Sequence, residues 1–255
     1  MIPLEAKEAS WYQKLHPIVE AGMHLSSFEG SIKDLRQTAD IKKDLAYGQN
    51  NSSYFSLGLQ TDYPYMFNIL WDYFDHKQSQ TSTLNKTIYI ADGQFETNST
   101  VITYIHYTVS NLTFLYDFYY KGNRVKFLRW RFYPGDLAYY VGLNVKYLYW
   151  RIDANKVPQE RKHWVIVKEF IPLPYLGVQY FYRYLRIYAH ISALSLNEAK
   201  STNYEVGFAY RAYRNFYLKA SYLYEDFQAT ESAGGHVDIV KFATSGTKFS
   251  FQYTF

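Results

Sequence analysis

The last eight residues, Lys248–Phe255, read KFSFQYTF, and every second residue of this octet is aromatic. Phe249, Phe251, Tyr253 and Phe255 would share one face of a β-strand, because successive side chains of a strand point to opposite faces. Polar residues would fill the other face. The octet therefore predicts a strand with one wholly aromatic face and one wholly polar face.

The same alternation recurs along much of the chain. Its apolar face carries Val, Ile, Leu, Phe and Tyr, and its other face mixes Gly, Ala and Ser with charged residues. A soluble β-sandwich shows the same period, but small and charged residues together suit a crowded barrel lumen better than a solvated surface. Large aromatics near the strand ends suit the girdles of a membrane barrel. The alternating segments are 19–26, 55–60, 67–73, 139–149, 185–193, 203–211 and 216–225.

The composition also favours a membrane barrel. Of the 255 residues, 29 are Tyr, and each buried Tyr hydroxyl needs a hydrogen-bond partner, which is hard to supply so often in one soluble core. Aromatic girdles at the two membrane surfaces keep those hydroxyls wet. No apolar run of about 18 residues is present, but a barrel strand needs only about 9–11 residues. The net charge of +4 is too small to predict a nucleic-acid partner.

Short and long connections alternate between the expected strands. Short turns fall at 62–64, 133–136, 182–183 and 213–215. In outer-membrane barrels the short turns face the periplasm and the long loops face the exterior, so we expect both chain ends in the periplasm and an even number of strands. Residues 33–46 are expected to form a short helix in the first long loop. The long stretches fall at 27–51, 76–97, 153–164, 195–202 and 228–243.

The strand count depends on one region. If 100–109, 112–120 and 125–132 are separate strands, the barrel has twelve strands; if the region forms one long strand with an outer extension, it has ten. We favour twelve. We expect residues 1–13 to form a periplasmic lead and residues 14–255 to form one all-β domain, a transmembrane antiparallel up-and-down β-barrel.

The C-terminal octet resembles the terminal-strand signal of bacterial outer-membrane proteins, in which alternating apolar residues and a last aromatic are recognised by the barrel-insertion machinery. Residues 137–255 are similar to small outer-membrane barrel families in which a Pro-Leu-Pro segment, here 172–174, leads into a strand. The resemblance implies a β-barrel in the outer membrane of a Gram-negative bacterium, in contact with outer-membrane lipid, lipopolysaccharide and the insertion machinery. It implies no activity, because a fold does not carry function.

The sequence contains one candidate catalytic pair. Outer-membrane phospholipases and lipid A deacylases place His and Ser two residues apart on one strand. Here Thr108 follows His106 at that spacing, and Ser110 lies four residues after His106 on the same face. His106 and Ser110 are candidates for a lipid hydrolase; the alternative is that they are polar lumen residues near a strand end. Omptin-type proteases use paired Asp residues with an Asp–His couple. Asp72, Asp75 and His76 lie at an expected outer strand end, but the matching partner pairs are missing.

Several charged residues fall on the polar faces of the expected strands and would point into the lumen. Charges in a narrow barrel must be paired, which predicts a salt-bridged plug. Their positive excess favours instead an anion-selective, porin-like pore. These residues are Arg129, Arg131, Lys146, Arg186, Arg211, Lys219, Lys248, Glu20, Asp72, Glu205 and Glu225.

These patterns predict a non-enzymatic barrel that is either structural or a narrow small-solute channel with a net-positive lumen. The alternatives are a lipid hydrolase and a docking subunit of a larger envelope complex, which would bind other envelope proteins through residues 1–13. No metal or cofactor is expected, because the 7 histidines show no metal-ligand spacing and the chain has no phosphate-binding glycine loop.

Overall fold

Strands and turns make up the part of the chain that the structure describes. The computed structural model describes residues 15–33, 37–61, 67–91, 93–122, 125–127, 130–132, 135–158, 162–195, 199–233 and 236–255. The expected periplasmic lead (1–13) and the expected short turn at 62–64 lie outside these residues. Among the described residues, no helix is long and apolar enough to cross a membrane.

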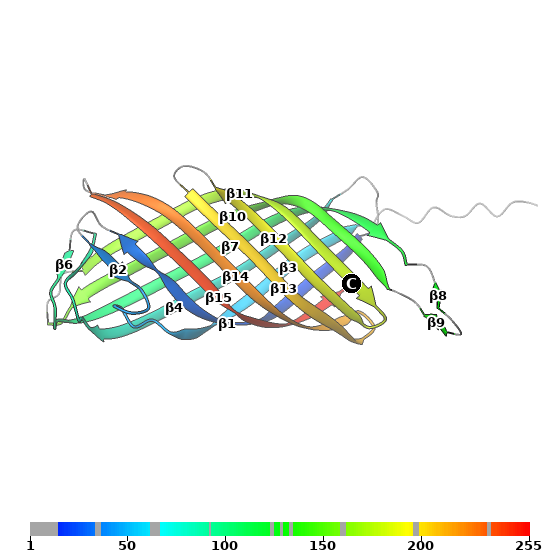
Figure 1. The fold of residues 1–255 in the computed structure, drawn as a ribbon, viewed down its shortest axis with the longest axis horizontal. Coiled ribbons are helices and arrows are strands. Elements are labelled where there is room, and N and C mark those ends of the chain that lie inside the picture. The colour runs from blue at the N-terminus through cyan, green and yellow to red at the C-terminus, as the bar shows by residue number, and fades with distance from the viewer. Residues whose placement is uncertain are drawn as a thin grey trace, which may run out of the picture.

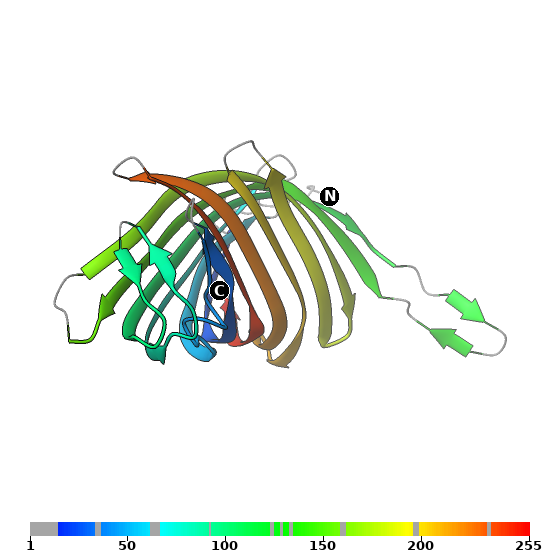
Figure 2. The ribbon, with the colours of Figure 1, turned by 60° about the vertical axis from the view of Figure 1, so that its left-hand side comes forward.

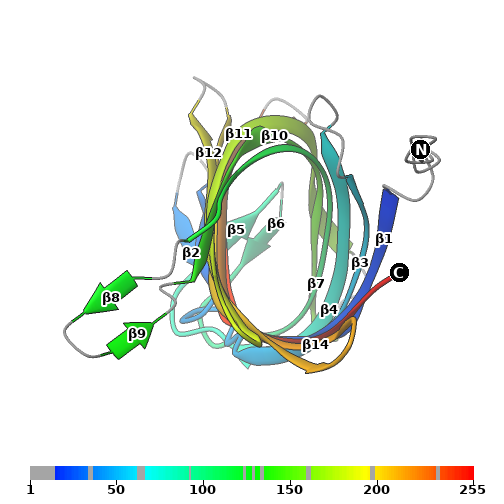
Figure 3. The same cartoon turned by 90° about the vertical axis from the view of Figure 1, so that its right-hand side faces the viewer.

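Ten long strands form a closed antiparallel ring. Each strand pairs with the ring strands before and after it, and the last pairs back onto the first from Ile18↔Thr254 to Lys33↔Ile239. Figure 3 shows the ring along its axis, and Figure 1 shows the tilted strands from the side. The ring strands are β1 (Leu15–Lys33), β3 (Gln49–Thr61), β4 (Asn68–Thr83), β7 (Thr100–Tyr120), β10 (Asp136–Lys156), β11 (Lys162–Tyr182), β12 (Leu185–Ser195), β13 (Ala199–Tyr213), β14 (Phe216–Ala233) and β15 (His236–Thr254).

The preference for twelve strands was wrong, because β7 is one strand of 21 residues. It pairs without interruption with β4 on one side and β10 on the other. Ser110 and Asn111, which suggested a turn, lie inside both ladders. The Ser110 hydroxyl accepts a hydrogen bond from the Trp71 indole at 2.8 Å, so the neighbouring strand satisfies this polar group within the wall.

The rest of that region forms a small hairpin outside the ring. β8 (Val125–Phe127) pairs with β9 (Trp130–Phe132). This hairpin extends from the barrel end at which the C-terminus lies (Figure 1). β10 begins only after it, so the connection expected as a short turn at 133–136 belongs to a longer excursion on the short-turn side.

The wall alternates as the sequence predicted. On β15, Phe251 points outward and is 59 % exposed, whereas Ser250 and Gln252 are buried in the interior. On β10, Leu143 points outward and Lys146 inward. Tyrosine and phenylalanine gather at both margins of the outward apolar band, as aromatic girdles do. They include Phe118, Tyr139, Tyr182, Tyr213 and Phe255 at the short-turn margin, and Phe170, Tyr204 and Tyr222 toward the other.

The strands run farther at the long-loop end than the sequence indicated. β1 continues to Lys33, β4 to Thr83 and β14 to Ala233. Much of the three longest expected loops is therefore strand, and the barrel extends past the lipid-facing band at this end.

Short strands and turns close the long-loop end, and the helix expected at 33–46 does not form. β2 (Thr38–Asp40) pairs with β1 and is followed by a turn. β5 (Ile88–Ile90) pairs with β6 (Gly93–Phe95), and these elements gather at one end of the barrel (Figures 1 and 2). Their inward apolar side chains are fully buried, which explains why apolar residues recur among the charges of this segment. The buried residues are Ile41, Leu45, Tyr47, Leu84, Ile88, Ile90 and Phe95.

One ladder of the wall is incomplete. β11 pairs with β12 only over residues 175–182, although it pairs with β10 over nearly its whole length. Pro172 and Pro174 lie just beyond the last β12 pair, inside β11 and not ahead of a strand. A proline has no N–H to give to a ladder, so it suits a stretch with a free edge.

Replacing Leu143 with Arg should destabilise the barrel by about 2–4 kcal/mol, because Leu143 faces outward near the middle of the apolar band. Ile102→Arg is the matched control: Ile102 also faces outward, but on the part of β7 near the long-loop end. The stability of both variants is measured by guanidinium unfolding from lipid vesicles, with the folded fraction read from heat-modifiable migration on gels. Equal losses in the two variants would contradict the assigned lipid band.

Candidate functional site

The middle of the barrel interior contains paired charges, and the first group forms at the ring closure. The Lys219 ammonium is ion-paired with the Glu20 carboxylate, and the Ser250 hydroxyl donates to the same carboxylate at 2.5 Å. Glu20 lies on β1, Lys219 on β14 and Ser250 on β15. β14 and β15 are consecutive strands of one hairpin, and β1 is their neighbour only because the ring closes.

Glu205 is the centre of a second group. Lys248 Nζ lies 2.7 Å from Glu205 Oε1, and the Ser221 and Tyr188 hydroxyls donate to that oxygen at 2.6 and 3.1 Å. His190 Nε2 lies 3.7 Å from the other carboxylate oxygen. Glu205 is only 6 % exposed, so its partners, not water, stabilise the charge.

Lys146 and Glu225 form the third group. Lys146 is fully buried; its Nζ lies 3.5 Å from Glu225 Oε1 and donates to the Asn203 side-chain carbonyl at 2.5 Å. A fourth carboxylate, Asp72, accepts a hydrogen bond from the Tyr54 hydroxyl at 2.7 Å. Every carboxylate of the interior network is thus bonded to a neighbouring side chain.

The predicted positive excess is not found within this buried network. Its cations are three lysines, and its anions are four carboxylates. Its members are Lys146, Lys219, Lys248, Glu20, Asp72, Glu205 and Glu225. We call these seven residues the charged network.

Of the arginines that were predicted to line the lumen, Arg186 does so at one end of the barrel, and none of the described arginines joins the charged network. Arg186 lies near the short-turn mouth, where it donates to the Gln252 side chain at 2.8 Å. Arg211 lies beside a short turn, with its guanidinium 5.2 Å from a tyrosine ring centroid. Arg129 lies outside the described residues, and so does the side chain of Arg131. The charged network therefore gives no support for an anion-favouring lining, and Arg186 is a single cation among the described residues at the mouth.

An aromatic layer covers the charged network on the long-loop side. The Phe242 ring centroid lies 4.8 Å from that of Tyr107, 5.0 Å from that of Phe28 and 5.6 Å from that of Phe227. The Tyr107 hydroxyl donates to Glu225 at 3.2 Å and so joins the layer to the network. We call the following buried residues the aromatic layer: Phe28, Phe74, Tyr107, Trp150, Phe227 and Phe242.

The described residues enclose a small cavity in the middle of the barrel and a larger hollow at one end. The cavity among the charged residues has a volume of about 50 Å³, which is room for a few water molecules. A larger hollow of about 350 Å³ lies at the short-turn end, around Arg186, Tyr217 and Gln252. The interior is thus a vestibule at one end and a filled core beyond it.

The sequence analysis missed the aromatic layer, because it treated 27–51 and 228–243, which contain Phe28 and Phe242, as loops. Phe28 and Ile32 keep the inward parity of Ser26 on β1, so the period of two continues through the expected loop. What changes is the inner face, which turns from polar to apolar. An alternation that keeps its period and exchanges its faces is the signal that would have found this layer.

The candidate catalytic residues lie on the outer wall and not in the lumen. His106 Nε2 lies 2.7 Å from Asp75 Oδ1 and 3.1 Å from Thr108 Oγ1. A catalytic relay needs the orienting carboxylate on one ring nitrogen and the nucleophile on the other, whereas here both meet the same nitrogen. Ser110 is bonded to Trp71 instead. The geometry does not assemble a nucleophile, base and orienting group.

The Asp–His couple considered for a protease is divided between two faces. Asp72 and His76 point into the barrel and Asp75 points outward, because even and odd residues of β4 lie on opposite faces. Within the described part of the chain, no group of three His, Asp or Glu residues could hold a metal ion.

The chain folds as a closed antiparallel β-barrel with an outward apolar band, the architecture of outer-membrane barrels. No protein-family model matches it, and no curated protein matches it in sequence. It is similar in structure to the outer membrane protease OmpT from Escherichia coli, with 9 % identity, 93 % of this chain and 97 % of that chain covered, and a TM-score of 0.49. It is also similar to the translocator domain of autotransporter NalP from Neisseria meningitidis (12 % identity, 93 % and 88 % covered, TM-score 0.43). Another similar structure is Ail of Yersinia pestis (10 % identity, 95 % and 99 % covered, TM-score 0.36).

None of these three TM-scores exceeds 0.49, so the assignment of the fold rests on the molecule itself. A closed antiparallel ring is one of only two ways in which a backbone can cross lipid with its polar groups bonded. The outward apolar band and its aromatic margins complete the architecture of an outer-membrane barrel.

Replacing Lys248 with Met should destabilise the folded barrel by roughly 3–5 kcal/mol, because Glu205 would keep a buried charge without its cation. Adding Glu205→Gln to the same chain should recover part of the loss, since no unpaired carboxylate then remains. Lys43→Met, at an exposed lysine, is the control and should change little. Urea unfolding from lipid vesicles measures the three variants. A Lys248→Met barrel as stable as the wild type would contradict a desolvated pair.

Proposed function

We propose that this protein is a sealed, non-conducting outer-membrane barrel with a structural role, which acts through its outer wall and its ends. The observation that carries the proposal is the filled interior. Each lysine of the charged network is paired with a carboxylate, and about 50 Å³ of space is left among them. A solute on the barrel axis would have to displace these pairs.

Two barriers of different kinds lie on the axis. Separating a buried ion pair costs several kcal/mol, because the remaining charge has no water to replace its partner. The aromatic layer resists wetting, because its rings are buried against one another and exposing apolar surface to water is unfavourable. Barrels of about eight strands are filled by side chains in the same way. A structural role therefore fits this interior better than a small-solute channel.

Swelling of proteoliposomes in small sugars tests the proposal. The expected result is the swelling rate of empty vesicles, with insertion checked on the same vesicles by heat-modifiable migration and with an outer-membrane porin as the positive control. Swelling that rises in proportion to the inserted protein would overturn a sealed interior.

A further inference from the structure

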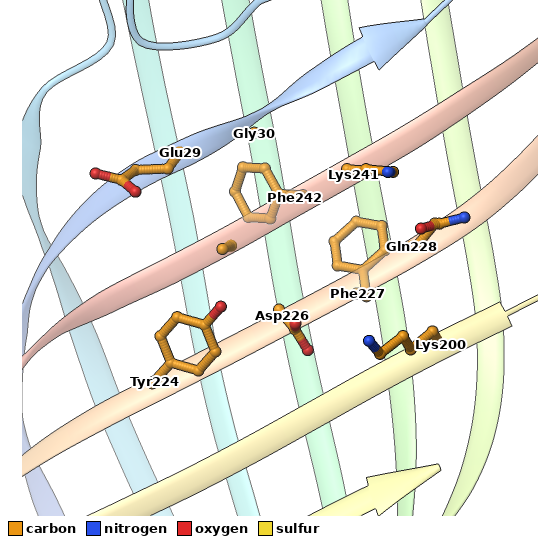
Figure 4. A pocket seen from close by; sticks show the side chains of 10 residues that line it. Glu29, Gly30, Lys200, Tyr224, Asp226, Phe227, Gln228, Lys241 and Phe242 are labelled. Atoms are coloured by element: carbon orange, nitrogen blue, oxygen red, sulfur yellow. The ribbon is translucent and has the colours of Figure 1, made fainter. Parts of the chain in front are cut away.

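A polar groove lies on the outer wall of the barrel where β1, β13, β14 and β15 rise toward the long-loop end (Figure 4). Its volume is about 360 Å³, which is in the range of small-molecule sites. We call it the headgroup groove, and its outward polar side chains are Glu29, Lys200, Tyr224, Asp226, Gln228 and Lys241. Phe227 and Phe242, which alternate with these residues, are buried on the other side of the wall.

The groove presents two ammonium groups on either side of one amide. Lys200 is the cross-strand neighbour of Gln228 on one side, and Lys241 is its neighbour on the other. Directly opposed side chains on neighbouring strands start about 4.5–5.5 Å apart at Cβ, so both lysines can reach one ligand placed over Gln228. Figure 4 shows the three side chains on three successive strands.

The two lysines are not used by the protein's own carboxylates. Glu29 forms an ion pair with Lys42, with 2.6 Å between Nζ and Oε1. Within the described residues, no ion pair joins Lys200 or Lys241 to a carboxylate. The Asp226 carboxylate also lines the groove, and it makes no ion pair or side-chain hydrogen bond among the same residues. The groove therefore offers two free cations and an unused acceptor for hydroxyl or amide groups.

A second hollow lies farther down the same wall. Its volume is about 500 Å³, and its lining is almost wholly apolar. Ala220 makes the hollow, because this small residue lies opposite Phe208 on β13 and Phe249 on β15. We call it the acyl groove; its outward lining residues are Leu185, Ile187, Val206, Phe208, Ala220 and Tyr222.

β14 connects the two grooves. Its outward residues change from polar to apolar along the strand: Gln228 and Asp226 belong to the headgroup groove, and Tyr222 and Ala220 to the acyl groove. Tyr224 lies between them and stacks on Tyr204 of the girdle, with ring centroids 4.9 Å apart. The polar groove thus lies at the level where the apolar band ends, which is the headgroup level of the outer leaflet.

We propose that this wall binds one phosphorylated glycolipid of the outer leaflet, of the lipopolysaccharide class. Lys200 and Lys241 hold a phosphate of its sugar headgroup, Asp226 and Gln228 bond its hydroxyl or amide groups, and an acyl chain lies over Ala220. A glycolipid fits better than a simple phospholipid, because the groove combines the cations with an acceptor that needs a donor from the ligand. The proposal concerns the outer wall, so it does not depend on whether the lumen conducts.

Titration of the folded protein in phosphatidylcholine nanodiscs with fluorescent lipid A tests the site. The double variant Lys200→Gln/Lys241→Gln should bind roughly tenfold or more weakly, because each lysine near a phosphate contributes on the order of 1 kcal/mol. The control double variant Lys43→Gln/Lys162→Gln removes two exposed lysines of the same barrel end outside the groove and should bind as the wild type does. Equal binding by the two double variants would overturn the proposal.

Two further measurements test the acyl chain and the phosphate of the ligand separately. Ala220→Phe should weaken binding of lipid A and leave the stability of the barrel nearly unchanged, because the new ring fills a lipid-facing hollow. Dephosphorylated lipid A should bind more weakly than lipid A. Competition by phosphatidylglycerol as strong as that by unlabelled lipid A would overturn the assignment to a glycolipid, because it would show that a phosphate on any lipid suffices.

Discussion

Within lipid, every backbone N–H and C=O must find its partner inside the protein, and the pairing of β15 with β1 meets this requirement where the first and last strands of the ring join. The rest of the molecule depends on that closure. It brings Glu20 against Ser250, 230 residues away in sequence, and places Lys219 beside both. The charged network can form because the first strand and the last two lie side by side.

The faces of the wall differ between its lipid-facing half and the half near the long loops. Apolar side chains point outward in the first half and inward in the second. Along the lipid-facing half of β14, Ala220 and Tyr222 point outward while Ser221 and Glu225 point inward. Beyond the girdle the faces exchange: Asp226 and Gln228 point outward and Phe227 is buried inside. Where lipid surrounds β14, its apolar face points outward, which is the reverse of a soluble protein. Where water surrounds it, its apolar face is buried inside, as in a soluble protein. This exchange produces both the aromatic layer that closes the interior and the polar groove on the outer wall.

The exchange of apolar and polar faces along the strands also explains which parts of the structure the sequence could predict. Alternation assigned the faces of the lipid-embedded strands correctly, because one face of each had to be apolar; the octet ending at Phe255 is the clearest case. The continuation of β1 beyond Ser26 was missed, because an alternation with polar residues outside resembles a loop in a membrane protein. Ser110 and Asn111 were read as a turn, because a hydroxyl that bonds to Trp71 across strands cannot be recognised locally.

The interior pairing and the outer groove depend on register, which the sequence alone does not contain. Glu205 meets Lys248 because two hairpins place β13 and β15 on either side of β14. Lys200 and Lys241 flank Gln228 for the same reason, although their expected positions were in long loops. The positive lumen was expected from residue counts along the strands, whereas the structure distributes those charges among the network, the mouth and the turns.

The most direct test of the sealed interior is the reactivity of a single cysteine placed at Ser56, which is buried inside the ring at 1 % exposure. The chain has no native cysteine, so the label reports one position. The sealed barrel predicts that Ser56→Cys in lipid vesicles stays unmodified by a charged, water-soluble thiol reagent while Lys43→Cys on the exposed end reacts fully. Modification of Ser56→Cys at a rate near that of Lys43→Cys would show that water and the reagent enter the interior and would contradict the account.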